Sequence, residues 1–261
     1  MPSPVFAPAI REFEASLADV EENLRFVESA AWLRPRLGEL LNWDGLTQET
    51  RIRCQSFMDQ KDVQLDLIYR GMFVLIAGAF EQLIRRCLRD AVAQISTTSP
   101  RYVDLDAELV RQNVMRTGKA LATIFDPPAH FDLNYGQLCG NIGTCVETSE
   151  SVSLNADAFA LFFSTLTPTK LAEVLRRIGV TLDWNAIGRH SSVRAALDMK
   201  KTNETATAAQ RYLKTFINNR NKLAHTGSGG ISVSPTDLET SIKFFRGFVD
   251  ALTEAMHAQL F

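Results

Sequence analysis

Two residues near the carboxyl end of the chain, Arg220 and His225, have the side chains that metal-free cleavage of RNA requires. RNA carries its own nucleophile, the 2′-hydroxyl, so cleavage needs a proton acceptor, a proton donor and a cation that stabilises the crowded phosphorane. An imidazole, whose ordinary pKa is about 6.5, can accept or donate a proton, whereas a guanidinium stays charged and holds phosphate oxygens with two nitrogens. The spacing Arg-x4-His therefore favours phosphodiester chemistry in which the arginine binds and the histidine moves protons.

The residues around this pair predict the helix that places it. Apolar residues recur through 213 to 224 with the spacing of an amphipathic helix, and Arg220 falls inside that stripe. An arginine in such a position must face another helix or a cleft. Asn218, Asn221 and His225 share a neighbouring face of the same helix. The helix therefore lines up several polar side chains along one edge beside Arg220.

An ideal helix sets Arg220 and His225 about 140° apart, because five residues each turn about 100°. We therefore expect the last turn to loosen at Thr226-Gly227, so that both side chains can reach one phosphate. One arginine and one histidine are still only half of a site. A two-fold dimer that brings two such helix ends together would place two of each around a single phosphodiester.

Further polar residues of this helix are candidates for substrate contact. Asn221 either orients the phosphate or the imidazole, or is a solvated helix residue. Lys222, Lys214 and Asn218 are candidate substrate-binding residues, and the alternative for Lys222 is a plain surface cation. Residues 189 to 222 hold eight lysines and arginines against two acidic residues, a local net charge of +6. Such a concentration of charge is consistent with phosphate contact or with a solvated helical face.

Glu81 is a candidate supporting residue. It follows the apolar run Met72 to Phe80 and precedes Arg85 by four positions. Its carboxylate could pair with Arg220 or His225 across the fold, which would fix that side chain and adjust the histidine pKa. Alternatively, Glu81 pairs with Arg85 one turn further along the same helix.

Hydrophobic periodicity predicts a fold made of helices. Apolar residues spaced by three and four indicate a first helix over about residues 8 to 31, followed by a connection that starts at Pro35. Residues 51 to 95 contain no proline and predict one long helix or two nearly collinear ones. The run Met72 to Phe80 is apolar on every face, which is typical of a central helix surrounded by others.

Local start and stop signals delimit further helices. Thr167-Pro168 begins and Gly179 ends a short helix over about 168 to 178. Ser234-Pro235-Thr236-Asp237 is a strong start signal for a last helix over about 235 to 259. The helix that carries Arg220 spans about 204 to 225.

Strand signals are almost absent, because the chain shows no sustained alternation of apolar and polar residues. We therefore predict one all-α domain over residues 1 to 261, a helical bundle whose core consists of the helices over 8–31, 51–95, 204–225 and 235–259. An insertion over about 100 to 190 adds helical and loop structure to this bundle. Within it we expect a helix over 104 to 124 and an irregular stretch over 125 to 155.

Composition narrows the class of protein. The chain has 261 residues, of which 46% are apolar, and a net charge of −2, so a nucleic-acid site must be a local basic patch. The four cysteines include no Cys-x2-Cys pair and indicate reduced thiols of a cytoplasmic protein. The acidic, amphipathic start lacks the pattern of a secretory signal. The run Met72 to Phe80 is far shorter than the about 20 residues that span a bilayer, so we expect no membrane contact.

Neither a metal nor another cofactor is expected, because no cluster of aspartate, glutamate and histidine has ligand spacing. His130, His190 and His257 have no partner at ligand or catalytic spacing and are interpreted as structural or surface residues.

The segment from Arg220 to His225, Arg-Asn-Lys-Leu-Ala-His, resembles the motif of the HEPN superfamily (higher eukaryotes and prokaryotes nucleotide-binding domains). That motif is an arginine, a short spacer that begins with a polar residue, and a histidine, and Arg220, Asn221 and His225 fill these positions. The motif ends a helix and is followed by a capped final helix, and an earlier apolar helix contains Phe80-Glu81, as in the family. The resemblance is closest to the larger prokaryotic ribonucleases of toxin and phage-defence systems.

This resemblance implies an all-α bundle and a homodimer whose active cleft lies at the interface. It also implies a metal-independent endoribonuclease that leaves a 2′,3′-cyclic phosphate on its RNA substrate. A toxin or antiviral defence role follows, with an antitoxin or other inhibitory partner. The alternative function is a non-catalytic HEPN-like module that binds a nucleotide, RNA or a protein. A metal-dependent nuclease or phosphatase is disfavoured, because the sequence has no acidic cluster with ligand spacing.

Overall fold

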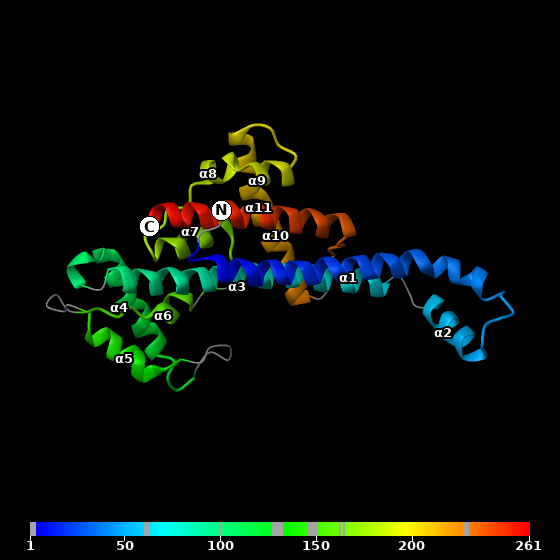
Figure 1. Cartoon of the computed structure of the whole chain (residues 1–261), viewed down its shortest axis with the longest axis horizontal. Helices are drawn as coiled ribbons and strands as arrows, with labels where there is room; N and C mark the ends of the chain where they lie inside the picture. Colours follow the sequence, from blue (N-terminus) through cyan, green and yellow to red (C-terminus); the bar gives the residue numbers. More distant parts are fainter. Residues whose placement is uncertain are drawn as a thin grey trace.

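A computed structural model describes residues 4–59, 63–99, 101–126, 133–145, 151–161, 163, 165–226 and 230–261. These residues form helices and connecting segments with no strand among them, which confirms the predicted all-α fold class. The long helices are α1 (Ala7–Leu40), α3 (Val63–Thr98), α10 (Thr202–Thr226) and α11 (Pro235–Leu260). In Figure 1, α1, α3 and α11 run along the long axis of the molecule and α10 crosses them.

The shorter helices follow one another between α1 and α10. They are α2 (Gln48–Met58), α4 (Ala107–Leu121), α5 (Tyr135–Gly143), α6 (Ala156–Ala160), α7 (Pro168–Arg176), α8 (Trp184–Arg189) and α9 (Ser191–Ala196), with the 3₁₀ turn η1 (Tyr102–Asp104) before α4.

Local caps start the helices where the sequence predicts. At α11, the Ser234 hydroxyl accepts from the Asp237 amide at 3.2 Å and the Asp237 carboxylate accepts from the Ser234 amide at 2.9 Å. At α7, the Thr167 hydroxyl accepts from the Lys170 amide, and Gly179 follows the helix with a φ of +82°. Both signals depend on a few neighbouring residues, so they can be recognised without knowledge of the tertiary structure.

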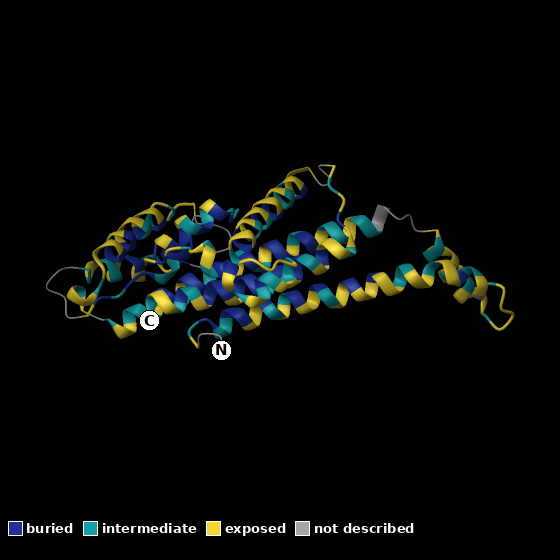
Figure 2. Ribbon diagram, turned by 90° about the horizontal axis from the view of Figure 1, so that it is seen from above, coloured by how far each residue is buried: buried dark blue, intermediate teal, exposed yellow. Residues whose placement is uncertain are grey.

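Aromatic side chains from α3, α10 and α11 pack together at the centre of the fold. Ring centroids lie 4.1 Å apart for Phe73 and Phe216, 4.7 Å for Phe216 and Phe245, and 4.9 Å for Phe80 and Phe245. All four rings are buried, and Figure 2 shows the buried residues concentrated along the middle of the molecule. Burial of each ring contributes about 1.5–3 kcal/mol. The cluster therefore fixes α10 against α3 one turn before Arg220.

The first helix continues to Leu40, so the predicted end near residue 31 and the connection at Pro35 are wrong. Pro35 lies inside α1, which a helix tolerates only when other contacts compensate for the lost hydrogen bond. Here the Arg34 guanidinium donates to the Met58 carbonyl oxygen with Nε at 3.1 Å and Nη2 at 2.9 Å. This contact ties the end of α1 to the end of α2, and we call residues 28–59 the arm.

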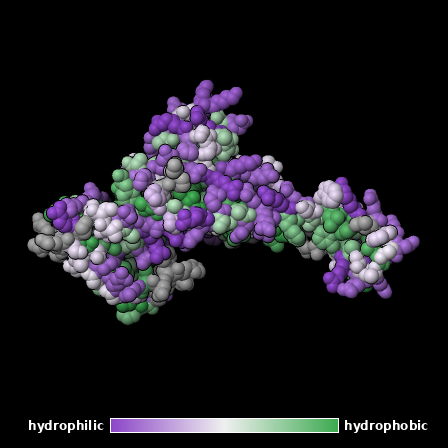
Figure 3. Space-filling model, viewed as in Figure 1, coloured by the Kyte–Doolittle hydropathy of each residue, from purple (hydrophilic) through white to green (hydrophobic). Residues whose placement is uncertain are grey.

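The arm projects from the body of the molecule (Figure 1). Helix α2 has no buried residue, and Trp32 and Trp43 are 60% and 62% exposed. Figure 3 shows hydrophobic patches on the arm among hydrophilic ones. Helix α2 is inclined to α3 in Figure 1, so the predicted single or collinear helix over 51 to 95 is two separate helices with different directions.

The described residues between 101 and 161 add a lobe with a small core of its own, to which Leu133, Leu138 and Leu161 contribute. Helix α5 lies in the stretch that was expected to be irregular. Its glycines give it a weak intrinsic preference for helix, so local sequence did not predict it. Buried amides compensate, because the Asn155 side chain donates to the Leu138 carbonyl oxygen of α5 at 3.0 Å.

In the part of the chain that the structure describes, helix α3 is covered on one side only, which corrects the expectation of a surrounded central helix. Phe80 is fully buried, but Leu75 is 63% exposed. A Cβ added at Gly71 or Gly78 would meet no atom within 4 Å. Among the described elements, α1, α6, α10 and α11 pack against α3 and leave this strip of its surface open.

In the described part of the chain, Leu65–Thr98 is long and apolar enough to cross a membrane by length and composition alone. A core helix of a soluble protein meets the same criterion. Met72, Ile76 and Phe80 of this segment are buried against neighbouring helices. Their packing accounts for much of its apolar character, and the expected absence of membrane contact stays a prediction.

The contact of α8 with α10 leads to a prediction about stability. A Cβ at Gly188 would lie 2.6 Å from the Thr202 carbonyl oxygen and 2.8 Å from the Ala206 nitrogen. Gly188→Ala should therefore lower the free energy of unfolding by about 1–3 kcal/mol, measured by urea denaturation. Gly118→Ala is the control, since its Cβ would meet nothing within 4 Å and alanine favours a helix interior. Equal stability of Gly188→Ala and the unsubstituted protein would contradict this close approach.

Candidate active site

Arg220 lies on the side of α10 that faces α3, as the apolar stripe predicts. Its side chain is 23% exposed, and Nη2 lies 3.6 Å from Oε2 of Glu81. Nη1 donates to Oδ1 of Asn221 at 3.2 Å, which places these two predicted site residues together. Nε is buried and has no acceptor within the described ranges. The guanidinium is therefore held in a defined orientation and retains donor capacity.

Glu81 connects Arg220 to the loop before α7. Its side chain is 13% exposed, and Oε1 accepts from the Thr165 amide at 2.9 Å. Thr165 has a φ of +66°, a strained backbone conformation that sequence reasoning did not anticipate. Arg85, the alternative partner of Glu81, donates to the Ala160 carbonyl oxygen at 2.6 Å, and the nearby Glu81 carboxylate opposes the lowering of the Arg85 pKa by burial. Glu81 therefore forms an ion pair with Arg220 and also attracts the guanidinium of Arg85.

His225 is exposed in the last turn of α10. The helix remains regular to Thr226, whose hydroxyl donates to the Lys222 carbonyl oxygen at 2.7 Å. The expected loosening of this turn is therefore wrong as far as Thr226, and Gly227 lies outside the described residues. Arg220 and His225 stay about 140° apart around the helix axis. A single chain does not aim both side chains at one phosphate.

Lys214 and Asn218, two of the predicted substrate-binding residues, line one groove between α10 and the start of α7. The groove has a volume of about 520 Å³ and also includes Arg211, which the sequence analysis missed. Lys222 is exposed further along α10 and does not line this groove. The helical spacing of Arg211 and Lys214 was the signal that would have identified Arg211.

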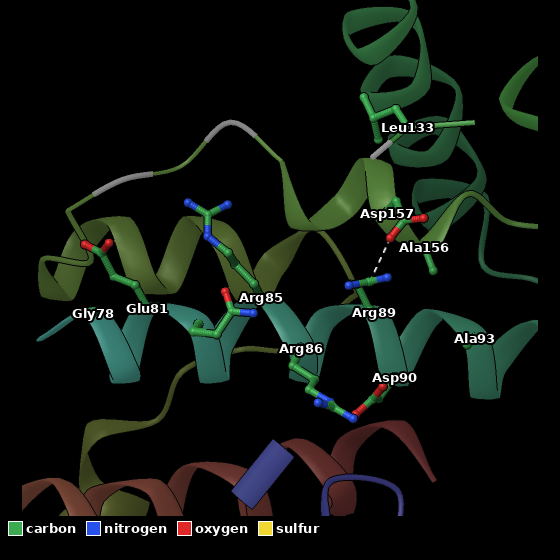
Figure 4. A pocket seen from close by; sticks show the side chains of 11 residues that line it. Gly78, Glu81, Arg85, Arg86, Arg89, Asp90, Ala93, Leu133, Ala156 and Asp157 are labelled. Carbon is green, nitrogen blue, oxygen red and sulfur yellow. Dashed lines mark ion pairs between the residues drawn. The ribbon is translucent and has the colours of Figure 1, made fainter. Parts of the chain in front are cut away.

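A larger cavity of about 870 Å³ runs along α3 and is lined by Arg85, Arg86 and Arg89 (Figure 4). Arg86 forms an ion pair with Glu12, and Nε of Arg89 lies 2.7 Å from Oδ1 of Asp157. Burial lowers the pKa of Arg85. The arginines of this cavity are thus engaged with other groups of the protein.

Carboxylates balance the charge of the same cavity. Glu81, Asp90 and Asp157 line it together with the three arginines (Figure 4). Burial raises the pKa of Asp90, while the nearby guanidinium groups of Arg86 and Arg89 oppose that rise. With three acidic and three basic side chains in the lining, the cavity does not form a basic path to Arg220.

A hollow of about 690 Å³ lies between α1 and α3 and has Arg220 in its lining. From α3 it includes Ile68, Gly71, Leu75 and Gly78, which we call the α3 face. Ile68 is 42% and Leu75 is 63% exposed. An apolar face therefore adjoins the guanidinium of Arg220.

The other side chains that could bind a metal ion do not lie together in one place. Within the described ranges, no group of three or more His, Cys, Asp or Glu side chains could hold a metal ion. The four cysteines are free thiols, and burial raises the pKa of Cys87. Nδ1 of His190 lies 2.6 Å from the Ser192 hydroxyl oxygen. The ring centroid of His257 lies 5.5 Å from that of Phe261 at the end of α11. His130 lies outside the described residues.

A comparison with protein-family models shows which family the chain resembles. The protein-family model HEPN_RiboL-PSP, described as RiboL-PSP-HEPN, matches residues 44–258. No curated protein and no solved structure matches the chain. The matched range spans most of the chain and includes Glu81, Arg220 and His225.

Proposed function

The chain belongs to the RiboL-PSP-HEPN family of the HEPN superfamily, and on this premise we propose that it is a metal-independent endoribonuclease. The 2′-hydroxyl of the RNA attacks the adjacent phosphorus and the bond to the 5′-oxygen breaks, which leaves a 2′,3′-cyclic phosphate and a 5′-hydroxyl. His225 accepts or donates the proton, and Arg220 stabilises the negative charge of the phosphorane. Asn221 orients the guanidinium, to which it is hydrogen-bonded.

The placement of Arg220 is the observation that carries this proposal. An arginine that only covers apolar surface extends its charged end into water. The Arg220 guanidinium instead lies against Glu81 and Asn221 at the edge of the hollow beside the α3 face. This arrangement supports a role in which the side chain presents its donors to an anionic ligand.

We further propose that two copies of the chain pair through the α3 face. One copy holds Arg220 and His225 on different sides of α10, so a second copy is needed to surround a phosphodiester with both residue types. The α3 face suits a self-complementary contact, because Ile68 and Leu75 are exposed and Gly71 and Gly78 leave room for close approach. Arg220 adjoins this face, so pairing there would bring the two arginines near each other.

The proposed reaction predicts the chemistry of the products. Purified protein incubated with unmodified RNA in excess EDTA should yield fragments with 2′,3′-cyclic phosphate and 5′-hydroxyl ends, identified by mass spectrometry. An RNA with a single 2′-deoxy nucleotide at a cleaved position should resist at that position only, because the nucleophile is missing there. Cleavage at the 2′-deoxy position, or loss of cleavage in EDTA, would exclude this mechanism.

A non-catalytic HEPN-like binding module is the second candidate function. The Glu81 carboxylate lies beside Arg220 in the single chain and would compete with a phosphate for the guanidinium. Such a module would bind RNA, a nucleotide or a protein without releasing fragments in the same assay. For the catalytic protein we propose a role as a toxin or antiviral effector that an inhibitory partner controls. Slowed growth of a host that expresses the protein would reveal this role.

A further inference from the structure

The outer face of α10 forms one side of a groove that no part of the proposed catalytic mechanism uses. Its lining from α10 consists of exposed polar or basic residues, Thr207, Gln210, Arg211, Lys214 and Asn218. Thr167, Pro168 and Thr169 at the start of α7 form the other side. The lining contains no carboxylate, in contrast to the balanced cavity along α3.

The two cations of this groove differ from surface lysines that are already paired with a carboxylate. Lys170, Lys201 and Lys243 each lie within an ion-pair distance of a glutamate, at 2.7, 3.0 and 3.9 Å. Arg211 and Lys214 have no ion pair in the described part of the chain, and α10 itself contains no acidic residue after Glu204. Their positive charges are therefore available to an external anion.

The groove lies in line with the histidine of the proposed site. Relative to His225, helical geometry places Lys214 and Asn218 within about 20° and Arg211 within about 40° around the helix axis. Along the axis, Lys214 lies about 16 Å and Arg211 about 21 Å before His225. These polar side chains thus form one straight, solvent-facing row that ends at the proposed acid/base group.

We propose that this groove binds the sugar-phosphate backbone of the RNA strand that flanks the cleaved bond. The inference rests on the proposed function, which supplies RNA as the substrate. It adds the residues that bind the flanking part of the strand, outside the reacting phosphate. Arg211 and Lys214 neutralise successive phosphates. Asn218 and Gln210 donate hydrogen bonds to the backbone, which reads no base sequence.

A binding experiment with an uncleavable strand tests this groove apart from catalysis. The unsubstituted protein is titrated into a short fluorescein-labelled 2′-O-methyl RNA, and the fluorescence anisotropy is recorded over a series of salt concentrations. The double variant Arg211→Ala/Lys214→Ala should bind about tenfold more weakly. Its plot of log affinity against log salt should be less steep by about 1.4, since each lost phosphate contact on a single strand removes about 0.7.

The matched control is Lys119→Ala/Lys243→Ala, which removes the same charge from exposed positions on α4 and α11. Unchanged binding by this control together with the loss in the groove variant supports the groove. Three results would overturn the proposed groove. They are equal effects of the two double variants, no effect of the groove variant, and no binding of the strand by the unsubstituted protein. Cleavage of unmodified RNA in EDTA is scored separately, so failure of the groove and failure of the proposed reaction are distinguishable.

Discussion

Replacing His225 by alanine is expected to reduce RNA cleavage by about 10²- to 10⁴-fold, the scale of a positioned acid/base group. The side chain is exposed and has no hydrogen bond or ion pair in the described part of the chain. Its loss should therefore change the free energy of unfolding by no more than about 0.5 kcal/mol. Single-turnover cleavage of unmodified RNA in EDTA measures the first effect, and urea denaturation the second.

The control for this variant is His257→Ala, which removes a histidine from the last turn of another helix, α11. Both histidines lie at helix carboxyl ends, where a positive side chain interacts favourably with the helix dipole. Only the His225 variant should lose cleavage and, in an expressing host, relieve slowed growth. Cleavage by His225→Ala at the unsubstituted rate would remove this residue from the mechanism, whereas equal losses in both variants would indicate a structural effect.

Local signals account for the parts of the fold that the sequence predicted. The capping box at Ser234 and the Thr167-Pro168 start are complete within a few residues, so neither depends on the rest of the molecule. The stripe around Arg220 likewise needed only the helical period. Helix α10 extends over Thr202–Thr226, close to the predicted 204 to 225.

Tertiary contacts decide the parts that the sequence did not predict. Pro35 lies inside α1 near the point where Arg34 ties this helix to α2, and buried amides and leucines hold the glycine-rich segment of α5. The exposure of Leu75 also depends on packing, since an apolar run does not reveal which of its faces lacks a neighbour within the chain.

In the candidate site, too, some features follow from local sequence and others from tertiary contacts. The inward direction of Arg220 follows from its own helix, but the choice of Glu81 as its partner depends on how α3 and α10 pack. The amide of Thr165 on Glu81 comes from a loop far away in the sequence, and no local pattern indicates it. Arg211 shares a helix face with Lys214 and could have been predicted from helical spacing alone.

The α3 face gives the second large expected effect, because Leu75→Glu should abolish both pairing and cleavage. At a two-fold contact, the substitution places two carboxylates opposite each other in an apolar interface, and leaving such charges buried and unpaired is strongly unfavourable. Leu75 is 63% exposed in the single chain, so the variant should fold normally. Light scattering should give the single-chain mass of 29.1 kDa in place of twice that mass. Cleavage should fall by at least about 10²-fold, since an unpaired subunit offers only one arginine and one histidine on different sides of α10.

Val114→Glu is the control for this variant, because Val114 is an apolar residue of α4 that is 45% exposed and lies away from the α3 face. It should retain the paired mass and the cleavage rate. Dilution provides an independent measurement: the specific activity of the unsubstituted protein should fall as pairs dissociate, whereas a site complete in one chain would keep its specific activity constant. A monomeric Leu75→Glu that still cleaves at the full rate would show that one chain suffices. Because α10 is regular through Thr226, such a result would require Arg220 or His225 to act without the other.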